Sequence, residues 1–160
     1  MSQGKLTAEQ IRERLRRVPF DMLLGMRLER VHEDGITVGC EIRDDLRNHS
    51  GAAHGGVAAA LADAAVGVAI QRHAGGERPI TTVELKINYF LPVIAGRMFA
   101  RARLLRVGST LCVGSVELTN ERAQLVGMAI VTYMFLDARG SGASTAATRP
   151  PEKGKRKQGR

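Results

Sequence analysis

The stretch VAAALADAAVGVAI, from Val57 to Ile70, decides how this chain folds. Apolar residues would lie on every side of a helix built from it, so the helix would lack the polar face of an ordinary surface helix. As a helix the stretch is about 21 Å long, whereas crossing the hydrocarbon core of a bilayer takes about 30 Å. Such a helix must be enclosed by protein, and we predict that it is the central core helix.

One acidic residue, Asp63, interrupts the middle of this apolar stretch, between Ala62 and Ala64. An isolated ionised carboxylate in such a place is strongly disfavoured unless something compensates its charge. Two explanations are open: a structural hydrogen bond to a neighbouring strand or turn, or a catalytic carboxylate in a partly dry cleft. The neighbouring residues favour the catalytic one.

Small residues share one side of the helix with Asp63. Gly56, Ala60, Asp63 and Gly67 follow the spacing that places residues on one stripe of a helix. Such a stripe lets another backbone come close to Asp63. The approaching element is either the same helix of a second subunit or a strand of the same chain.

The helix begins at His54-Gly55-Gly56, where the first backbone N–H groups lack partners within the helix and carry the positive end of its dipole. Glycine lets a ligand approach these donors, which would stabilise the oxyanion that forms when a thioester carbonyl is attacked. The two glycines can also simply make a tight turn into the helix. Both interpretations place residues 54–56 at the helix N-terminus.

Distance separates the two candidate parts of a site. Gly55 and Asp63 lie about 12 Å apart along one helix axis, which is too far for both to act on one reacting carbon. Two antiparallel helices would bring each Asp63 toward the N-terminus of the other. We therefore predict two equivalent sites across a two-fold dimer interface.

The segments before the central helix predict a helix and a hairpin. Thr7 and Gln10 resemble a capping box, and apolar residues at helical spacing follow until Pro19. Two alternating runs between Arg27 and Asp44 flank an Asp34-Gly35 pair, a strong hairpin signal. We expect a short amphipathic helix and then two antiparallel strands.

After the central helix the chain alternates between polar and apolar residues, which predicts strands. The expected strands span roughly 83–89, 97–107, 111–119 and 125–136. Short turns favour antiparallel neighbours, so we predict a meander of four long strands, with the first two strands completing the sheet around the helix. The fold class is α+β, with about six strands.

Composition fits one globular domain of 160 residues, because 44% of the chain is hydrophobic and 25% is charged. We expect a flexible N-terminus over 1–6, the domain over 7–137 and a disordered basic tail over 138–160. The net charge is +8, but six Lys or Arg and a single Glu lie between Arg149 and Arg160. That tail has no aromatic residue on which bases could stack, so nucleic-acid binding is not favoured.

Several chemistries find no support in the sequence. Cys40 and Cys112 lie far apart in apolar stretches and are interpreted as core residues, and the histidines lack the spacing of a zinc site. We therefore predict neither a metal nor another cofactor. The first eighteen residues include acidic side chains and lack the apolar stretch of a secretory signal, so a cytoplasmic protein without a membrane span is expected.

These residues together resemble the phenylacetate-pathway (PaaI-like) family of hotdog-fold acyl-CoA thioesterases. The resemblance runs from about Phe20 to Leu136. It is carried by Asn48, His54-Gly55-Gly56, Leu61-Ala62-Asp63, Gly67 and the run TVELKINYFLP from Thr82 to Pro92. It implies the hotdog fold, in which a long antiparallel sheet wraps a central helix. It also implies that two subunits pair into one continuous sheet and often assemble further into tetramers.

The resemblance also implies roles for individual residues. The Gly55 N–H and Asn48 would hold the thioester carbonyl, His54 would stand near the leaving sulfur, and Gly56 would contact the substrate. Asp63 of the opposite subunit would activate or orient water with the help of a strand hydroxyl. Counting back from Pro92 gives Thr82 for that hydroxyl and counting forward from His54 gives Thr81. We favour Thr82, because differences in loop length should fall before the strand.

The leading hypothesis is hydrolysis of an acyl-CoA to the free acid and CoA, with Asp63 as general base or nucleophile. A hotdog hydratase or dehydratase is a second enzymatic possibility, but the sequence lacks the His and acid in a Pro- and Gly-rich context that would favour it. A non-catalytic acyl-CoA-binding protein with the same fold is the third. The presence of Asn48, Gly55 and Asp63 argues against it.

Overall fold

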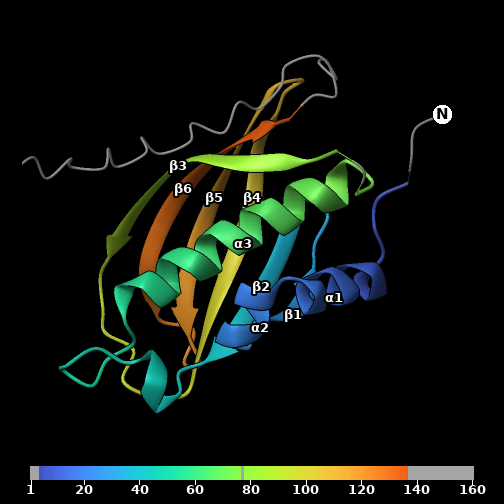
Figure 1. Cartoon of the computed structure of the whole chain (residues 1–160). Helices are drawn as coiled ribbons and strands as arrows, with labels where there is room; N and C mark the ends of the chain where they lie inside the picture. The colour runs from blue at the N-terminus through green and yellow to red at the C-terminus, as the bar shows by residue number, and fades with distance from the viewer. Residues whose placement is uncertain (1–3, 77, 137–160) are drawn as a thin grey trace, which may run out of the picture.

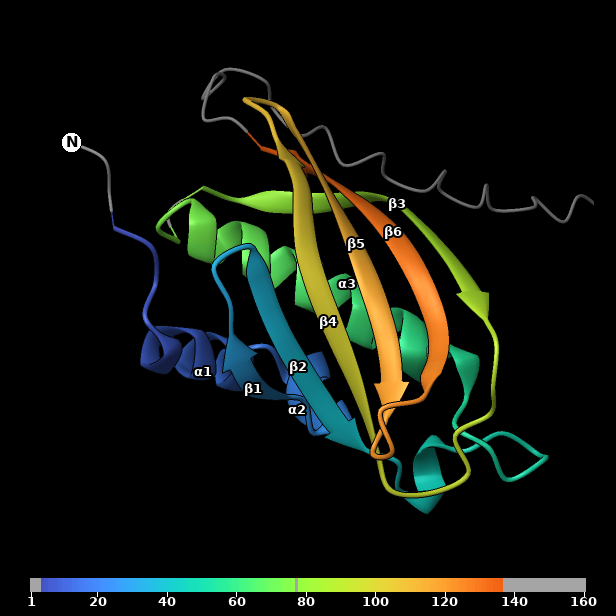
Figure 2. The ribbon, with the colours of Figure 1, turned by 180° about the vertical axis from the view of Figure 1, so that it is seen from behind.

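The computed structural model describes residues 4–76 and 78–136. A curved antiparallel sheet wraps one long helix, α3 (Gly55–His73). Two short helices precede the first strand (Figures 1 and 2). The six strands are β1 (Arg27–Val31), β2 (Gly35–Glu41), β3 (Ile80–Tyr89), β4 (Arg97–Val107), β5 (Leu111–Asn120) and β6 (Leu125–Phe135). This arrangement confirms the predicted α+β hotdog fold.

The strand order is β1-β2-β4-β5-β6-β3, so the predicted meander of four strands is wrong for one of them. Strands β4, β5 and β6 do follow one another through short turns. Strand β3 instead pairs with β6 at the far edge, and the segment after Tyr89 crosses the end of the sheet to reach β4 beside β2. A seven-residue connection is long enough for this crossing, whereas a tight turn would have forced β3 and β4 together.

The core lies between α3 and the concave face of the sheet. The side of α3 that faces the strands is buried and consists of Leu61, Ala62, Ala65, Val66, Ala69 and Ile70. Cys40 on β2 and Cys112 on β5 are buried in the same core, which confirms their interpretation. The opposite side of α3, with Ala60, Asp63, Ala64 and Val68, is only partly covered within one chain.

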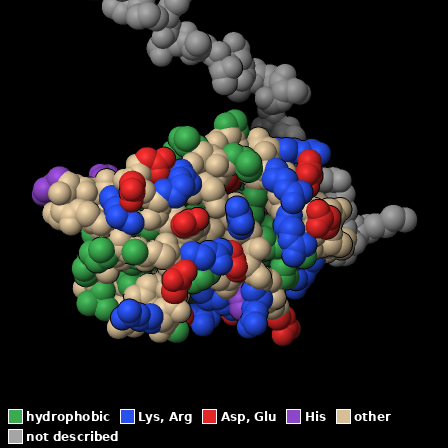
Figure 3. All heavy atoms as spheres, turned by 90° about the horizontal axis from the view of Figure 1, so that it is seen from below, with side chains coloured by type: hydrophobic (Ala, Val, Ile, Leu, Met, Phe, Trp, Pro, Cys, Tyr) green, Lys and Arg blue, Asp and Glu red, His purple; other side chains and the backbone are tan. Residues whose placement is uncertain are grey.

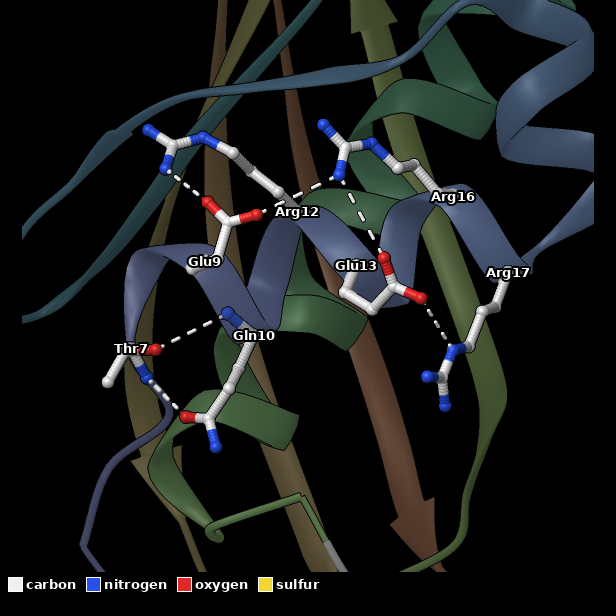
Figure 4. A network of polar contacts seen from close by, with 7 residues as sticks. All are labelled: Thr7, Glu9, Gln10, Arg12, Glu13, Arg16 and Arg17. Carbon is white, nitrogen blue, oxygen red and sulfur yellow. Dashed lines mark hydrogen bonds and ion pairs between the residues drawn. The ribbon is translucent and has the colours of Figure 1, made fainter.

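The N-terminal segment forms two helices where one was predicted. Helix α1 (Ala8–Arg17) has the expected capping box between Thr7 and Gln10, and ion pairs of Glu9 and Glu13 with arginines line its exposed side (Figure 4). Pro19 does not end the helical region but occupies the first turn of α2 (Pro19–Leu24). Proline is well tolerated there, because the first turn needs no donor from it.

One residue before the predicted start of the domain packs against the folded chain. Leu6 falls in the segment expected to be flexible, yet it is buried and its N–H donates to the carbonyl of Arg72 at 3.1 Å. Leu6 is therefore packed against the folded part of the described chain. The predicted basic tail, 138–160, lies outside the described residues.

Charged side chains on the described surface are largely interspersed. Arg97 pairs with Glu29, Arg101 with Asp34, and Arg103 with Glu117. On the face seen in Figure 3, Lys and Arg side chains likewise lie beside Asp and Glu side chains. These partly exposed pairs break up the basic charge of the folded part.

Candidate functional site

The N-terminus of α3 presents one free backbone donor. His54 is the N-cap residue, and its ring Nδ1 accepts the N–H of Gly56 at 3.0 Å. The Gly56 donor is therefore occupied by its own chain. The N–H of Gly55 has no hydrogen-bond partner within residues 4–76 and 78–136, so it is the donor of this pair that remains available to a ligand.

A second free donor comes from the loop that precedes the helix. The side-chain Oδ1 of Asn48 accepts the N–H groups of Ser50 at 2.9 Å and Ala52 at 3.2 Å, which shapes the loop. Because Oδ1 accepts two backbone donors, the Nδ2 amide must point the other way, and it has no partner among the described residues. The Oδ1 of Asn48 thus holds the loop, and its Nδ2 remains available to a ligand.

Asn48 and Gly55 both line a largely apolar cavity of about 350 Å³, here called the Asn48 cavity. Its polar groups come from Asn48, Gly55 and Tyr89, and its apolar wall includes Ala58, Met98, Leu118 and Val126. The Tyr89 hydroxyl donates to the carbonyl of Gly55 at 2.9 Å. A β-carbon on residue 55 would lie 3.2 Å from the Tyr89 ring, so glycine lets strand β3 close on the helix end.

Asp63 lies elsewhere, at a second cavity of about 420 Å³ between α3, the two N-terminal helices and strands β3 and β6. We call it the Asp63 cavity. The Thr82 hydroxyl donates to the Asp63 carboxylate, at 3.0 Å from Oδ1 and 3.2 Å from Oδ2. The hydroxyl on β3 that contacts Asp63 is therefore that of Thr82, the residue we favoured. Asp63 itself is only partly buried.

Thr81 occupies the opposite face of β3. It is paired with Met134 on the outside of the sheet, whereas Thr82 is paired with Tyr133, whose side chain points to the helix. Successive side chains of a strand point to opposite faces, so one hydroxyl reaches Asp63 and the other does not. The structure brings Thr82 and Asp63 together and leaves Thr81 and the exposed His54 ring apart from them.

The side chain of Tyr133 explains why residue 67 on the α3 stripe is glycine. The Tyr133 hydroxyl donates to the backbone carbonyl of Asp63 at 3.0 Å, and a β-carbon on Gly67 would come within 2.7 Å of that hydroxyl. At Gly67, then, a strand of the same chain makes the close approach, which was one of the two expected explanations. Burial, and to a lesser extent the Asp63 charge, raises the pKa of Tyr133, although the Thr82 hydroxyl opposes this, so the phenol is a neutral donor.

Asp21, on α2, is a functional candidate that the sequence did not point out. It lines the Asp63 cavity and is 8% exposed, the only carboxylic acid buried in the described part of the chain. Burial, and secondarily the nearby Asp63 carboxylate, raises its pKa. An acid within the run PFDMLLGM is the signal that would have indicated it.

The two cavities do not share their polar groups. Asn48 and Gly55 do not line the Asp63 cavity, and Asp63 does not line the Asn48 cavity. Among the described residues there is no cluster of three or more metal-binding side chains, and none of the described helices is long and apolar enough to cross a membrane.

Comparison with known proteins agrees with this architecture. A family model described as "Thioesterase superfamily" matches residues 50–126. The medium/long-chain acyl-CoA thioesterase YigI of Escherichia coli is 30% identical over 132 residues, which cover 73% of this chain and 85% of YigI.

Solved structures are similar over most of their length. A thioesterase of Haemophilus influenzae has a TM-score of 0.80 at 20% identity and covers 89% of this chain and 100% of its own, which shows the shared fold. A mutant of the phenylacetic acid degradation protein PaaI from Thermus thermophilus is 30% identical with a TM-score of 0.66. That match covers 73% of this chain and 98% of PaaI.

Proposed function

This chain belongs to the thioesterase superfamily and is a thioester hydrolase, and from that premise we propose that it hydrolyses acyl-CoA to a free acid and CoA. One observation carries the proposal. A single chain holds free hydrogen-bond donors in one cavity and a supported carboxylate in another. These are the two halves that thioester hydrolysis requires, and a second copy of the chain can bring them together.

In the proposed site the thioester carbonyl lies in the Asn48 cavity. The Gly55 N–H and the Asn48 Nδ2 donate to its oxygen and stabilise the negative charge that develops there. The cavity wall is mostly apolar, which strengthens both hydrogen bonds because little water competes with them. The Gly56 N–H donates to the His54 ring Nδ1, so it is not a donor to the substrate.

Asp63 of the partner subunit supplies the base or the nucleophile. As a base it takes a proton from water, whose oxygen attacks the carbonyl carbon, and as a nucleophile it attacks that carbon itself. The Thr82 hydroxyl donates to both carboxylate oxygens and so fixes the orientation of the group in either route. A single turnover in oxygen-labelled water separates the routes, because only the general-base route must place the label in the released acid.

His54 is the proposed donor to the leaving sulfur. Its Nδ1 accepts the N–H of Gly56, so in the neutral ring the proton is on Nε2. That N–H is exposed at the helix N-terminus and is free to hydrogen-bond the CoA thiolate as the C–S bond breaks.

Pairing through β3 would assemble the two halves. Within the described chain β3 pairs only with β6, and its other edge, with the exposed Thr81, Val83 and Glu84, is open. A second copy of β3 can continue the sheet there, with the two α3 helices antiparallel across the two-fold axis. The partly uncovered side of α3 would then face the partner. We propose a dimer with two sites, which can pair again into a tetramer.

Release of CoA thiol from a panel of acyl-CoAs tests the activity, with Asp63→Ala and Asp63→Asn beside the wild type. Hydrolysis of medium- or long-chain substrates that both variants lose supports the proposal. Variants as fast as the wild type would disprove the role of Asp63. Binding without turnover of any substrate would instead favour an acyl-CoA-binding protein.

Mixed dimers test the shared site directly. Asp63→Asn and Asn48→Ala chains are each inactive on their own in this proposal. Unfolded and refolded together in equal amounts, they form mixed dimers that hold one complete site, which restores about a quarter of the wild-type activity if pairing is random. A mixture as inactive as either variant would place both residues in sites within one chain.

A further inference from the structure

Asp21 is in an environment that the proposed function does not explain. The residue lines the Asp63 cavity from α2 and is 8% exposed. Within residues 4–76 and 78–136 its carboxyl group has neither a hydrogen-bond donor nor a cationic partner. A buried carboxylate without either is strongly disfavoured in its ionised form.

The groups that face Asp21 across the cavity do not supply the missing positive charge. From α3 comes Asp63, which is itself acidic, and from β6 the phenol of Tyr133, which donates to the Asp63 backbone carbonyl. From α1 comes Arg14, whose Nη2 donates to the carbonyl of Gly76 at 2.6 Å. The Thr82 hydroxyl on β3 is directed to Asp63.

Two carboxyl groups therefore share one largely apolar cavity, and one of them has a donor while the other has none. Burial without a hydrogen-bond donor disfavours the charged form of a carboxyl group. Asp63 has the donor and is the more exposed. The buried Asp21 is the group left to hold the proton.

We propose that Asp21 is a positioning residue for Asp63: it stays protonated in the working enzyme, so that the cavity carries a single negative charge, located on Asp63. This inference rests on the proposed function for the role of Asp63. Burial and the adjacent carboxylate, which raise the pKa of Asp21, agree with it. Ionisation of Asp21 would place a second charge beside Asp63 and weaken its orientation toward the substrate.

The state of the proton can be tested without any substrate. An acid whose pKa is raised by folding stabilises the folded protein at low pH, and that contribution is lost as the pH rises through the folded-state pKa. Asp21→Asn mimics the protonated acid and cannot lose a proton. Its Tm should match that of the wild type in acid and exceed it by a few degrees at alkaline pH.

The matched control is Asp44→Asn, because the side chain of Asp44 is 93% exposed. The Tm of this variant should not rise above that of the wild type as the pH increases, because it loses only an exposed ion pair with Arg47. If Asp21→Asn is equally stable or less stable than the wild type at alkaline pH, Asp21 is ionised at no detectable cost and the proposal is overturned.

The pH profile of kcat/KM tests the effect on Asp63. We expect the wild type to lose activity as the pH rises and Asp21 ionises, and Asp21→Asn to lack that decline. Asp21→Ala, which removes the group entirely, should be about tenfold slower, and Asn should recover most of that loss. Identical alkaline limbs in wild type and Asp21→Asn would contradict the inference. If even the wild type hydrolyses no acyl-CoA, the proposed function fails while the Tm comparison still decides the state of Asp21.

Discussion

The Asn48 cavity and the Asp63 cavity lie along the same helix but have opposite chemistry. The first presents two donors that have no partner among the described residues, the Gly55 N–H and the Asn48 amide, and the second presents carboxyl groups. A helix exposes free N–H groups only in its first turn, so backbone donors must be at its end. In its middle only a side chain can act, and an acid there needs support from neighbouring strands. One helix therefore cannot offer both to the same atom.

Asn48→Asp should lower the activity most, and it changes the Asn48 cavity alone. The carboxylate keeps the acceptor that holds Ser50 and Ala52 but loses the free amide. Loss of one oxyanion donor lowers kcat by about 100- to 1,000-fold. Steady-state kinetics with thermal melts check this, and Asn48→Ala, which also loses the loop contacts, is the comparison. A variant within threefold of the wild type would remove Asn48 from the site.

Gly67→Ala should disturb the packing beside the Asp63 cavity. The new methyl group would meet the Tyr133 hydroxyl at 2.7 Å, and overpacking usually costs about 1–3 kcal/mol, against about 1 kcal/mol gained in helix propensity. We expect a net loss of stability in urea unfolding. The effect should shrink in the double variant with Tyr133→Phe, which removes the hydroxyl; additive losses would show that the clash is elsewhere.

Thr82→Val tests whether a hydroxyl is what supports Asp63. Valine keeps the shape of threonine and removes both hydrogen bonds to the carboxylate, so kcat should fall about tenfold with little change in KM. Thr82→Ser should retain most of the activity. The same pair of changes at Thr81, on the outer face of the sheet, is the control and should leave kcat unaltered.

Tyr133→Phe alone should have the smallest effect. It removes one hydrogen bond, to the Asp63 carbonyl, and a neutral bond of this kind contributes about 1 kcal/mol. Urea unfolding measures the loss. An effect on stability without an effect on kcat would show that Tyr133 supports the structure of the Asp63 cavity and takes no part in catalysis.

Features that depend on local periodicity could be predicted from the sequence. The central helix, the strands and the capping box at Thr7 each follow from residue spacing. The choice of Thr82 over Thr81 needed an argument about loop length, and the contact with Asp63 agrees with it. The thioesterase superfamily was also identified from its motifs, whereas membership of the PaaI-like branch stays a prediction.

Features that depend on long-range packing could not be predicted. The position of β3 at the sheet edge depends on a crossing segment whose sequence allows either neighbour. Asp21 was missed because Pro19 was interpreted as the end of helical structure, so the short helix that carries the acid into the cavity was not expected. The partner of each buried group is decided by which elements meet, and residue spacing along the chain does not reveal that.

Because both cysteines are buried, the folded enzyme should add little signal to an assay that detects released CoA with a thiol reagent. Cys40 and Cys112 are each 1% exposed, and burial raises the pKa of both thiols, that of Cys40 to about 11. Thiol reagents attack the thiolate, so the folded chain should react slowly while released CoA reacts at once. The same reagent added to the protein alone would then count the molecules that have opened, two sulfhydryls for each chain.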